Sequence, residues 1–581
     1  MRLVLAALGL LALASPALAL DAGDPGARLA ALEQRYLERL FRAKPHLADY
    51  MGDHRHAGEL ADLSPHGVSR RAAELAAQRR ELAGVDRAAL TPDQHVDAAI
   101  LEDGLALEML ELQEIREWTW NPRLVDSFTY YDPREMVAAR LSDIVHGTWG
   151  TPAQRLKAVT SQLQALPRFL ADRRKALKAV SKVHLEQAIQ DNKGRLTFFE
   201  TELARFTRRS GRAEAARRRA VKALRGFQAF METDLPARAT QDWRLGPELY
   251  RKKFPLALQT EVTADELARL AREDFAAARK ELQEVAHRLH RELLPNEPEP
   301  PGGGLIAIVK DAITKDHPAA DGLVQASAEK LDGLRAFVDE KELVTLSPKD
   351  TLSVEPMPEF KRSGSGAEYL SPGALDRRAG FHGTYYVEPP DPTWPKEKIE
   401  SYLRANNHHE IALTAAHEAL PGHHTQAWWA RRDRSALRAT LWSGPFAEGW
   451  AVYGTTLLVK LGFGGEKNDR LLFLDLFGRM IVAANTILDV GLQGGEMSDE
   501  DALRFMIDDG FQEKAQAERK LLRAKLDSTQ LCQYFLGRAE IDRLEREVRE
   551  RGAFDQRKFD EALLSHGTVA VRHLRDLVLG R

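Results

Sequence analysis

Apolar residues recur at three- and four-residue spacing through most of the first 300 positions. This spacing places them on one face of an α-helix, and the helix-favouring residues Ala, Leu, Glu and Arg dominate the runs. Thr263 and Glu266 add the signature of a helix N-terminus. The pattern predicts helices at 27–42, 70–85, 95–112, 151–177, within 180–233, and at 263–294.

Strand-like patterns appear only after residue 340. The runs 343–347, 351–356 and 383–390 are punctuated by proline and glycine, which is typical of short antiparallel or edge strands. Helical periodicity returns near residue 396 and continues almost to the end, and no fixed-period repeat is evident. The chain is therefore predicted to be mainly α, with one small antiparallel sheet just before the later helices.

A change of composition divides the chain. Residues 295–304 (PNEPEPPGGG) contain four prolines and three glycines, the composition of a linker or a long surface loop. We expect an N-terminal helical part at 20–294 and a second part at 305–581. No Gly-Lys-Ser/Thr follows the glycines, so they do not indicate a phosphate-binding loop.

The first nineteen residues have the pattern of a signal peptide. Arg2 supplies a positive charge, residues 3–14 are apolar, and Ala17-Leu18-Ala19 is an A-x-A cleavage site. An uncleaved N-terminal anchor is the alternative. No cysteine follows the site to carry a lipid, and no later run of about 18 uninterrupted apolar residues exists. We expect an exported protein, periplasmic or extracellular, with no integral membrane segment after cleavage.

The charge balance argues against a nucleic-acid partner. The chain has 83 basic and 86 acidic side chains and a formal net charge of −3, so it has no overall positive field for phosphates. The stretch 208–226 is basic, but acidic and apolar residues interleave with it, which favours a charged, exposed helix. The single cysteine, Cys532, excludes an intramolecular disulfide.

Residues 411–429 (IALTAAHEALPGHHTQAWW) carry the candidate chemistry. His417-Glu418 begins like the H-E-x-x-H motif, in which two histidines bind zinc and the glutamate acts as general base. Pro421 occupies the position of the second histidine, and the next candidates are His423 and His424. On an unbroken helix these would lie about 9 and 10.5 Å further along the axis. Pro421-Gly422 would have to open the helix to return one of them to His417.

Glu448 is the candidate third ligand. It follows His417 by 31 residues, beside Trp450 and Tyr453 on a predicted helix with an apolar face, where a carboxylate is expected to be partly buried and to need a partner. Two histidines and a glutamate that leave one position open to water form the ligand set of several zinc peptidases. The alternative is that these histidines lie on the exposed surface of a helix and bind no metal.

These motifs resemble a known family. HEALPGHHTQ followed by AEGWAVY is similar to the signature of the bacterial "domain of unknown function 885" family, and weaker matches include EWTWNPR (117–123), AEYLSP (367–372), DVGLQ (489–493) and QYFLG (533–537). The resemblance covers roughly residues 27–575. It implies a large helical fold with a deep cleft, similar to angiotensin-converting enzyme and thimet oligopeptidase, in which the small sheet lies next to the motif helix.

The resemblance also implies roles for individual residues. His417, His423 and Glu448 would bind Zn²⁺, with His424 as the competing second ligand, and Glu418 would be the general base. Two positions depart from the family pattern, because Thr455 stands where a glutamate is usual and Gln493 where a histidine is usual. A changed group behind the metal ligands would weaken metal binding or shift specificity.

Two further assignments concern the substrate. By analogy with related helical peptidases, Tyr534 would donate to the oxyanion that forms during hydrolysis, although a plain core tyrosine is an equal alternative. The strand at Gly383–Val387 would pair with an extended peptide, or else belong to a structural hairpin.

The sequence therefore predicts an exported zinc metallopeptidase that hydrolyses short peptides. If it is a carboxypeptidase, Arg519, Arg523 and Arg538 are candidates for binding the terminal carboxylate. The alternatives are an inactive, metal-free peptide-binding protein of the same fold and a zinc amidase acting on modified peptides or cell-wall fragments. The sequence does not indicate the oligomeric state.

Overall fold

The computed structural model describes residues 24–126, 134–358, 362, 366–376 and 380–579. The predicted signal peptide, residues 1–19, lies outside them. The helices up to the proline-rich segment are α1 (Pro25–Ala43), α2 (Pro45–Tyr50), α3 (Pro65–Ala83), α4 (Pro92–Leu110), α5 (Ala138–His146), α6 (Pro152–Ala176), α7 (Lys182–Glu200), α8 (Glu202–Thr207), α9 (Gly211–Thr233), α10 (Gly246–Ala257) and α11 (Ala264–Leu293).

Residues 295–302 connect α11 to the second group of helices. These are α12 (Gly303–Thr314), α13 (Leu323–Glu340), α14 (Lys396–Ala405), α15 (His408–Glu418), α16 (His423–Ala430), α17 (Ala436–Thr440), α18 (Gly444–Lys460), α19 (Asn468–Gly494), α20 (Asp499–Arg504), α21 (Lys514–Leu526), α22 (Gln533–Glu550), α23 (Gln556–Leu564) and α24 (Val571–Leu579). The mainly α fold and all six predicted helical stretches are confirmed, with 180–233 divided among α7, α8 and α9.

Side-chain caps explain where many helices begin. Thr91 and Thr151 each form a reciprocal capping box with a glutamine three residues later, and a proline occupies the first turn of both helices. These groups satisfy backbone N–H donors that have no partner inside the helix. The Thr263 side chain likewise accepts from the Glu266 N–H at the start of α11, as the sequence predicts.

The sheet near the motif helix is mixed. It consists of β3 (Leu352–Pro356), β4 (Ala367–Leu370) and β5 (Gly383–Val387) in the order β3-β5-β4, with β3 parallel and β4 antiparallel to β5. The prediction of a purely antiparallel sheet is wrong in this detail, because the 356–383 connection carries β4 and turns the chain twice. A separate pair joins β1 (Val125–Asp126) to β2 (Arg134–Glu135).

Two of the strand predictions need correction. Residues 343–347 form no strand, because side chains rather than a neighbouring strand bond their backbone: Trp429 Nε1 donates to the Thr345 carbonyl, and the Thr345 N–H donates to Glu561. Gly383–Val387 does form a strand, but β5 is the central one, with both sides already paired. It therefore offers no edge to a peptide, whereas β4 does.

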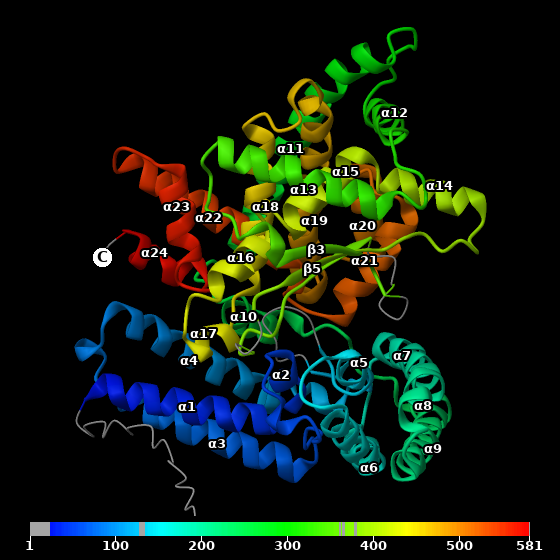
Figure 1. Cartoon of the computed structure of the whole chain (residues 1–581), viewed down its shortest axis with the longest axis vertical. Helices are drawn as coiled ribbons and strands as arrows, with labels where there is room; N and C mark the ends of the chain where they lie inside the picture. The colour runs from blue at the N-terminus through cyan, green and yellow to red at the C-terminus, as the bar shows by residue number, and fades with distance from the viewer. Residues whose placement is uncertain (1–23, 127–133, 359–361, 363–365, 377–379, 580–581) are drawn as a thin grey trace, which may run out of the picture.

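The core joins the two ends of the chain. One cluster of buried side chains combines Leu32, Tyr36 and Leu101 of the N-terminal helices with residues of α15, α18, α22 and α24. In Figure 1 the blue helices α1, α3 and α4 lie along the base, and the yellow α16–α18 and red α22–α24 lie above them. A second core lies between α11 and α19, and a third lies within α5–α9.

Within the described part of the chain, α19 is the one helix long and apolar enough to cross a membrane. In its most apolar 18-residue window 67% is buried inside the protein. It packs along α11, as a core helix of a globular protein does.

Candidate functional site

The motif segment is two helices rather than one. The Asn407 side chain caps α15 by accepting from the His409 and Glu410 N–H groups, and α15 ends at Glu418. Residues 419–422 form a tight connection that includes a cis Leu420–Pro421 bond, and α16 then begins at His423. The Gly422 N–H donates to the Ala416 carbonyl at 3.0 Å. This connection folds His423 back toward His417.

The connection depends on close contacts. A Cβ at position 422 would overlap the carbonyl oxygen of His417, so only glycine fits there. Trp450 Nε1 of α18 donates to the Pro421 carbonyl at 2.9 Å, and Gly454 of the same helix leaves room for the proline ring. The break between the two histidines is therefore held against the helix that carries Glu448.

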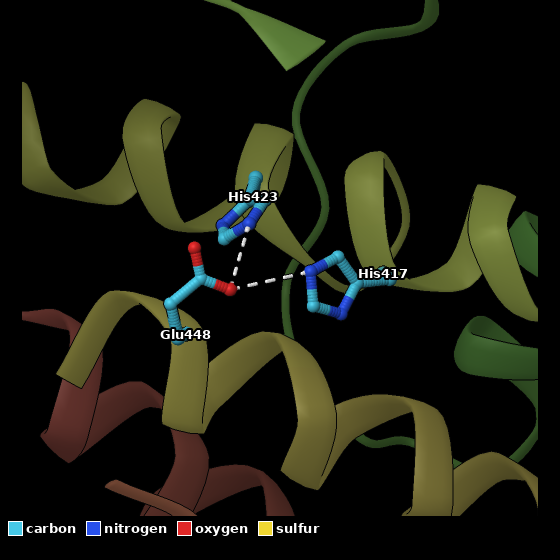
Figure 2. A group of neighbouring side chains, drawn as sticks. All are labelled: His417, His423 and Glu448. Carbon is cyan, nitrogen blue, oxygen red and sulfur yellow. Dashed lines mark ion pairs between the residues drawn. The ribbon is translucent and has the colours of Figure 1, made fainter. Parts of the chain in front are cut away.

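His417, His423 and Glu448 converge on one point (Figure 2). Glu448 Oε2 lies 3.4 Å from His417 Nε2 and 3.8 Å from His423 Nε2. The imidazole rings meet nearly edge to face, with their centroids 4.8 Å apart. All the potential ligand atoms lie within 4.8 Å of one another.

This geometry suits a tetrahedral zinc ion. Ligand atoms bonded to zinc at about 2.0–2.1 Å lie about 3.3 Å from one another. Glu448 Oε2 is at 3.4 and 3.8 Å from the two imidazole nitrogens, and no pair of potential ligand atoms is more than 4.8 Å apart, so side-chain rotations would bring the three atoms to bonding positions. Glu448 is 2% exposed, so its carboxylate is removed from water and faces the two imidazoles.

The local charge favours a cation. Burial alone would lower the pKa of His417, but the hydrogen bond that its imidazole donates to Glu448 and the charges of Glu418 and Glu448 hold that pKa above its ordinary value. The carboxylates therefore create a negative potential at the point where the ligand atoms meet. A divalent ion would supply the positive charge that this potential favours.

Glu418 lies between the cluster and the sheet. Its Oε2 accepts the backbone N–H of Tyr369 in β4 at 3.0 Å. Among the described residues no hydrogen bond to its Oε1 is found. One oxygen thus fixes the carboxylate against the edge strand.

His424 faces away from the cluster. It is fully buried, with Nε2 2.7 Å from Ser347 Oγ and Nδ1 3.2 Å from the Tyr369 hydroxyl. Burial, together with the charges of Arg335 and His382, lowers the pKa of His424 to about 4, so the ring is neutral. Both of its nitrogens are engaged with the sheet region rather than with Glu448.

A cavity of about 740 Å³ opens onto the three ligands. His417, Glu418, His423 and Glu448 line one wall, β4 lines another, and Tyr534 of α22 belongs to the same lining. All the catalytic and metal candidates except His424 therefore share one chamber. Arg519, Arg523 and Arg538 do not contribute to it, and Arg538 instead pairs with Asp274 at 2.6 Å.

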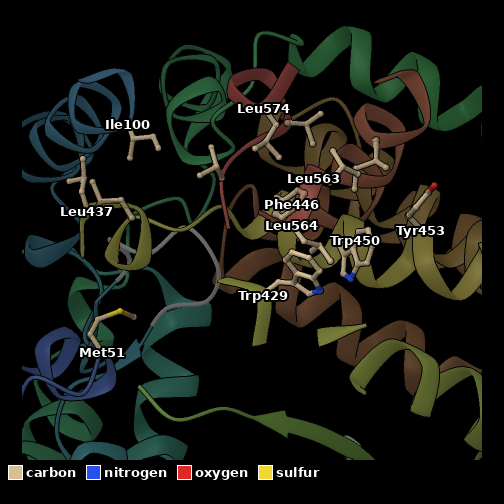
Figure 3. Close-up of a cluster of buried hydrophobic side chains, with 14 of the residues drawn as sticks. Met51, Ile100, Trp429, Leu437, Phe446, Trp450, Tyr453, Leu563, Leu564 and Leu574 are labelled. Atoms are coloured by element: carbon tan, nitrogen blue, oxygen red, sulfur yellow. The ribbon is translucent and has the colours of Figure 1, made fainter. Parts of the chain in front are cut away.

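The packing of α18 on α22 fixes the relative positions of Glu448 and Tyr534. Gly449 and Gly537 lie face to face, and a Cβ on Gly537 would overlap the carbonyl oxygen of Pro445. On its apolar side α18 contributes Phe446, Trp450 and Tyr453 to a cluster with Leu563 of α23 and Leu574 of α24 (Figure 3). The two helices are therefore in direct backbone contact at this point.

The two departures from the family pattern have local partners. The Thr455 hydroxyl donates to the Ala451 carbonyl of its own helix at 2.8 Å. Gln493 accepts the Leu245 N–H and donates to the Ala524 and Asp527 carbonyls, which ties α19 to α10 and α21. Neither residue lines the cavity.

Sequence reasoning missed Tyr369. Its backbone bonds the candidate base, and its hydroxyl bonds His424, so it links the motif helices to the edge strand. AEYL has a short alternating pattern that could have indicated a strand, but nothing in it specifies that this strand is an edge or that it lies beside Glu418.

A protein family and two solved structures match this chain over almost its whole length. The family described as "Bacterial protein of unknown function (DUF885)" matches residues 45–578. A structure from Shewanella oneidensis, described as "a putative lipoprotein of unknown function", is 27% identical with a TM-score of 0.82, covering 95% of this chain and 99% of its own. A second "putative lipoprotein", from Colwellia psychrerythraea, is 16% identical with a TM-score of 0.74, covering 96% and 99%. No curated protein matches.

Proposed function

The chain belongs to the bacterial DUF885 family, whose function is unknown, and from this premise and the geometry of the site we propose that it is an exported zinc metallopeptidase acting on short peptides. The observation that carries the proposal is the convergence of His417, His423 and Glu448 in a cavity beside Glu418. Export is supported by the leader pattern of residues 1–19 and by the lipoprotein descriptions of the two similar structures.

His417, His423 and Glu448 would hold the zinc, leaving a fourth position toward the cavity. When bound, zinc polarises a carbonyl group and lowers the pKa of a coordinated water. Glu448 is buried, and the turn at Gly422 is packed so closely that a Cβ would not fit there. These contacts limit how far either histidine can move.

Glu418 is the proposed general base. It is the last residue of α15, one position after a ligand, and its Oε2 is anchored on the Tyr369 N–H. Oε1 would take the proton from the attacking water and then deliver it to the leaving amine. The Tyr369 bond fixes the orientation of the carboxylate.

Tyr534 is the proposed donor to the oxyanion. It lines the same cavity and is carried by α22, whose position relative to Glu448 is fixed by the Gly449–Gly537 contact. A hydroxyl held in this way stabilises developing negative charge with little reorganisation.

The peptide itself would lie along β4. This strand is an edge of the sheet and lines the cavity. An extended peptide would bind the main-chain groups of this edge other than the Tyr369 N–H, which Glu418 accepts, and would do so independently of its sequence. The cavity volume of about 740 Å³ suits a short peptide rather than a folded chain.

Arg134 is the best candidate for a terminal carboxylate, if the enzyme is a carboxypeptidase. Three other arginines line the cavity and are already engaged: Asp49 holds Arg140, Asp97 holds Arg438, and Arg431 donates to the Asp376 carbonyl at 2.8 Å. Arg134 stacks over the Tyr50 ring at 3.2 Å, and no ion pair to it occurs among the described residues. A preference for peptides with a free rather than an amidated C-terminus, lost in Arg134→Gln, would support this role.

The proposal is tested by incubating the zinc-loaded protein with a mixed peptide library and identifying products by mass spectrometry. Cleavage by the wild type and its loss in Glu418→Gln, with zinc retained, is the expected result. No cleavage of any peptide would contradict it. If the protein contained zinc but hydrolysed only cell-wall fragments, the amidase alternative would be favoured. If it bound peptides without containing metal, it would be an inactive binding protein.

A further inference from the structure

Positive charge is concentrated in one part of the molecule. Residues 151–240 contain 20 Lys and Arg against 8 Asp and Glu, a formal charge of +12, although the whole chain carries −3. These residues form α6, α7, α8 and α9, which share a separate hydrophobic core with α5. The group lies at the lower right of Figure 1, apart from the helices that carry the metal ligands.

The exposed side of α9 is almost entirely basic. Arg212, Arg218, Arg219, Lys222 and Arg225 are all exposed. At 100° per residue they lie within an arc of about 140° that runs along the helix. Val221, Leu224 and Phe227 occupy the opposite, buried side. We call this exposed arc of five side chains the basic face.

The basic face is incompletely neutralised. Arg218 pairs with Glu214 at 2.9 Å, and Arg225 pairs with Glu200 at 2.8 Å. For Arg212, Arg219 and Lys222 no ion pair occurs among the described residues. Like charges three and four residues apart destabilise a helix, and so do basic residues near its N-terminus. Folding alone therefore does not favour this pattern.

The chemistry of the basic face selects an extended anionic surface as its partner. The other exposed residues of α9 are small or acidic, and none is aromatic or carries a side-chain amide that would stack on or read a nucleic-acid base. No α9 residue lines the 740 Å³ or the 280 Å³ cavity, so a small anion has no enclosed site there. Basic residues arrayed on an amphipathic helix bind anionic lipid head groups.

We propose that the basic face of α9 docks the protein on an anionic lipid surface. Binding is electrostatic and reversible, because the face has no large apolar side chain to insert into the bilayer. The inference is independent of the metal site.

The experiment is co-sedimentation of the full chain with vesicles of phosphatidylcholine alone or mixed with phosphatidylglycerol. The wild type is expected to bind only the mixed vesicles and to dissociate as salt is raised. Arg212→Glu/Arg219→Glu/Lys222→Glu should weaken binding by at least two orders of magnitude, since each basic residue near an anionic surface strengthens binding about fivefold and each glutamate adds repulsion.

A matched control changes the same charge elsewhere. Arg272, Lys280 and Arg291 are exposed on α11 with no ion pair among the described residues, and their replacement by glutamate should leave most of the vesicle binding intact. If both triple variants lost vesicle binding equally, the binding would depend on net charge and not on the basic face, and the proposal would be overturned. Failure of the wild type to bind mixed vesicles at low salt, or binding to heparin alone, would also overturn it, and neither measurement requires the variants to fold.

Discussion

Two adjacent histidines have opposite surroundings at the residue scale. His423 faces Glu448 across 3.8 Å, while His424 is buried against Ser347, Tyr369 and Phe381. Successive helix residues point about 100° apart, so only one of the pair can reach the cluster. The structure therefore separates a candidate ligand from a residue that holds the sheet against the motif.

Replacement of these histidines should have different consequences. His423→Ala should remove most of the zinc with a modest effect on stability. His424→Ala should retain zinc but reduce the free energy of unfolding by about 2–3 kcal/mol, because it leaves a cavity and buried partners without hydrogen bonds. Metal analysis of both variants measures the zinc content, and denaturant unfolding measures the loss of stability. The opposite ranking of metal loss would transfer the ligand role to His424.

Tyr534 allows a second test at this scale. Tyr534→Phe should lower kcat about 100-fold with little change in KM or zinc content, because an oxyanion donor acts chiefly in the transition state. Steady-state kinetics on a peptide found in the library experiment would show it. An unchanged kcat would make Tyr534 a structural residue of the cavity wall.

The sequence predicts residue types better than residue directions. Partial burial of Glu448 follows from its apolar helix neighbours, and the structure confirms it at 2% exposure. The choice between His423 and His424, however, depends on the dihedral angles of four connecting residues. The connection packs against Trp450 and Gly454, which are distant from it in sequence.

At the element scale, the connection between α15 and α16 is the decisive feature. Gly422→Ala should lower zinc affinity about 10–100-fold, because a Cβ overlapping the His417 carbonyl must displace one ligand helix. Gly478→Ala is the control: it lies within α19 with no atom near the added methyl group and should be neutral or slightly stabilising. Zinc titration of both variants compares them. Unchanged affinity in Gly422→Ala would show that the connection adapts without moving His423.

The sheet shows what patterning cannot supply at this scale. The sequence predicts strands at 351–356 and 383–390, and the structure has β3 at Leu352–Pro356 and β5 at Gly383–Val387, but the sequence pattern carries no information on strand direction. Direction and edge status depend on β4, a four-residue strand whose pattern is too short to stand out. The element nearest the candidate base is thus the one that is hardest to predict.

At the scale of the whole molecule, the N-terminal helices and the motif helices share charged contacts as well as a core. Arg438 of α17 pairs with Asp97 of α4 at 2.6 Å, and Glu33 of α1 lies close to both. Burial, and the nearby charge of Asp97, raise the pKa of Glu33 to about 8 from an ordinary value of 4.5. The folded protein therefore holds a proton that the unfolded chain releases.

This linkage predicts a pH dependence of stability. Because Glu33 is protonated in the folded state between about pH 4.5 and 8, while the unfolded chain is not, stability should fall as pH rises through that interval. Glu33→Gln should raise stability at pH 8 by about 1–3 kcal/mol and have little effect near pH 4.5. Thermal unfolding at the two pH values tests this. The control Glu38→Gln, which is exposed on the same helix, should change neither.

The central claim is that His417, His423 and Glu448 hold a zinc ion. The most direct measurement is anomalous X-ray scattering at the zinc edge from crystals of the wild-type protein grown with zinc. The account predicts one strong peak within bonding distance of His417 Nε2, His423 Nε2 and Glu448 Oε2. No peak at this point, or a peak bound to His424 instead, would contradict it.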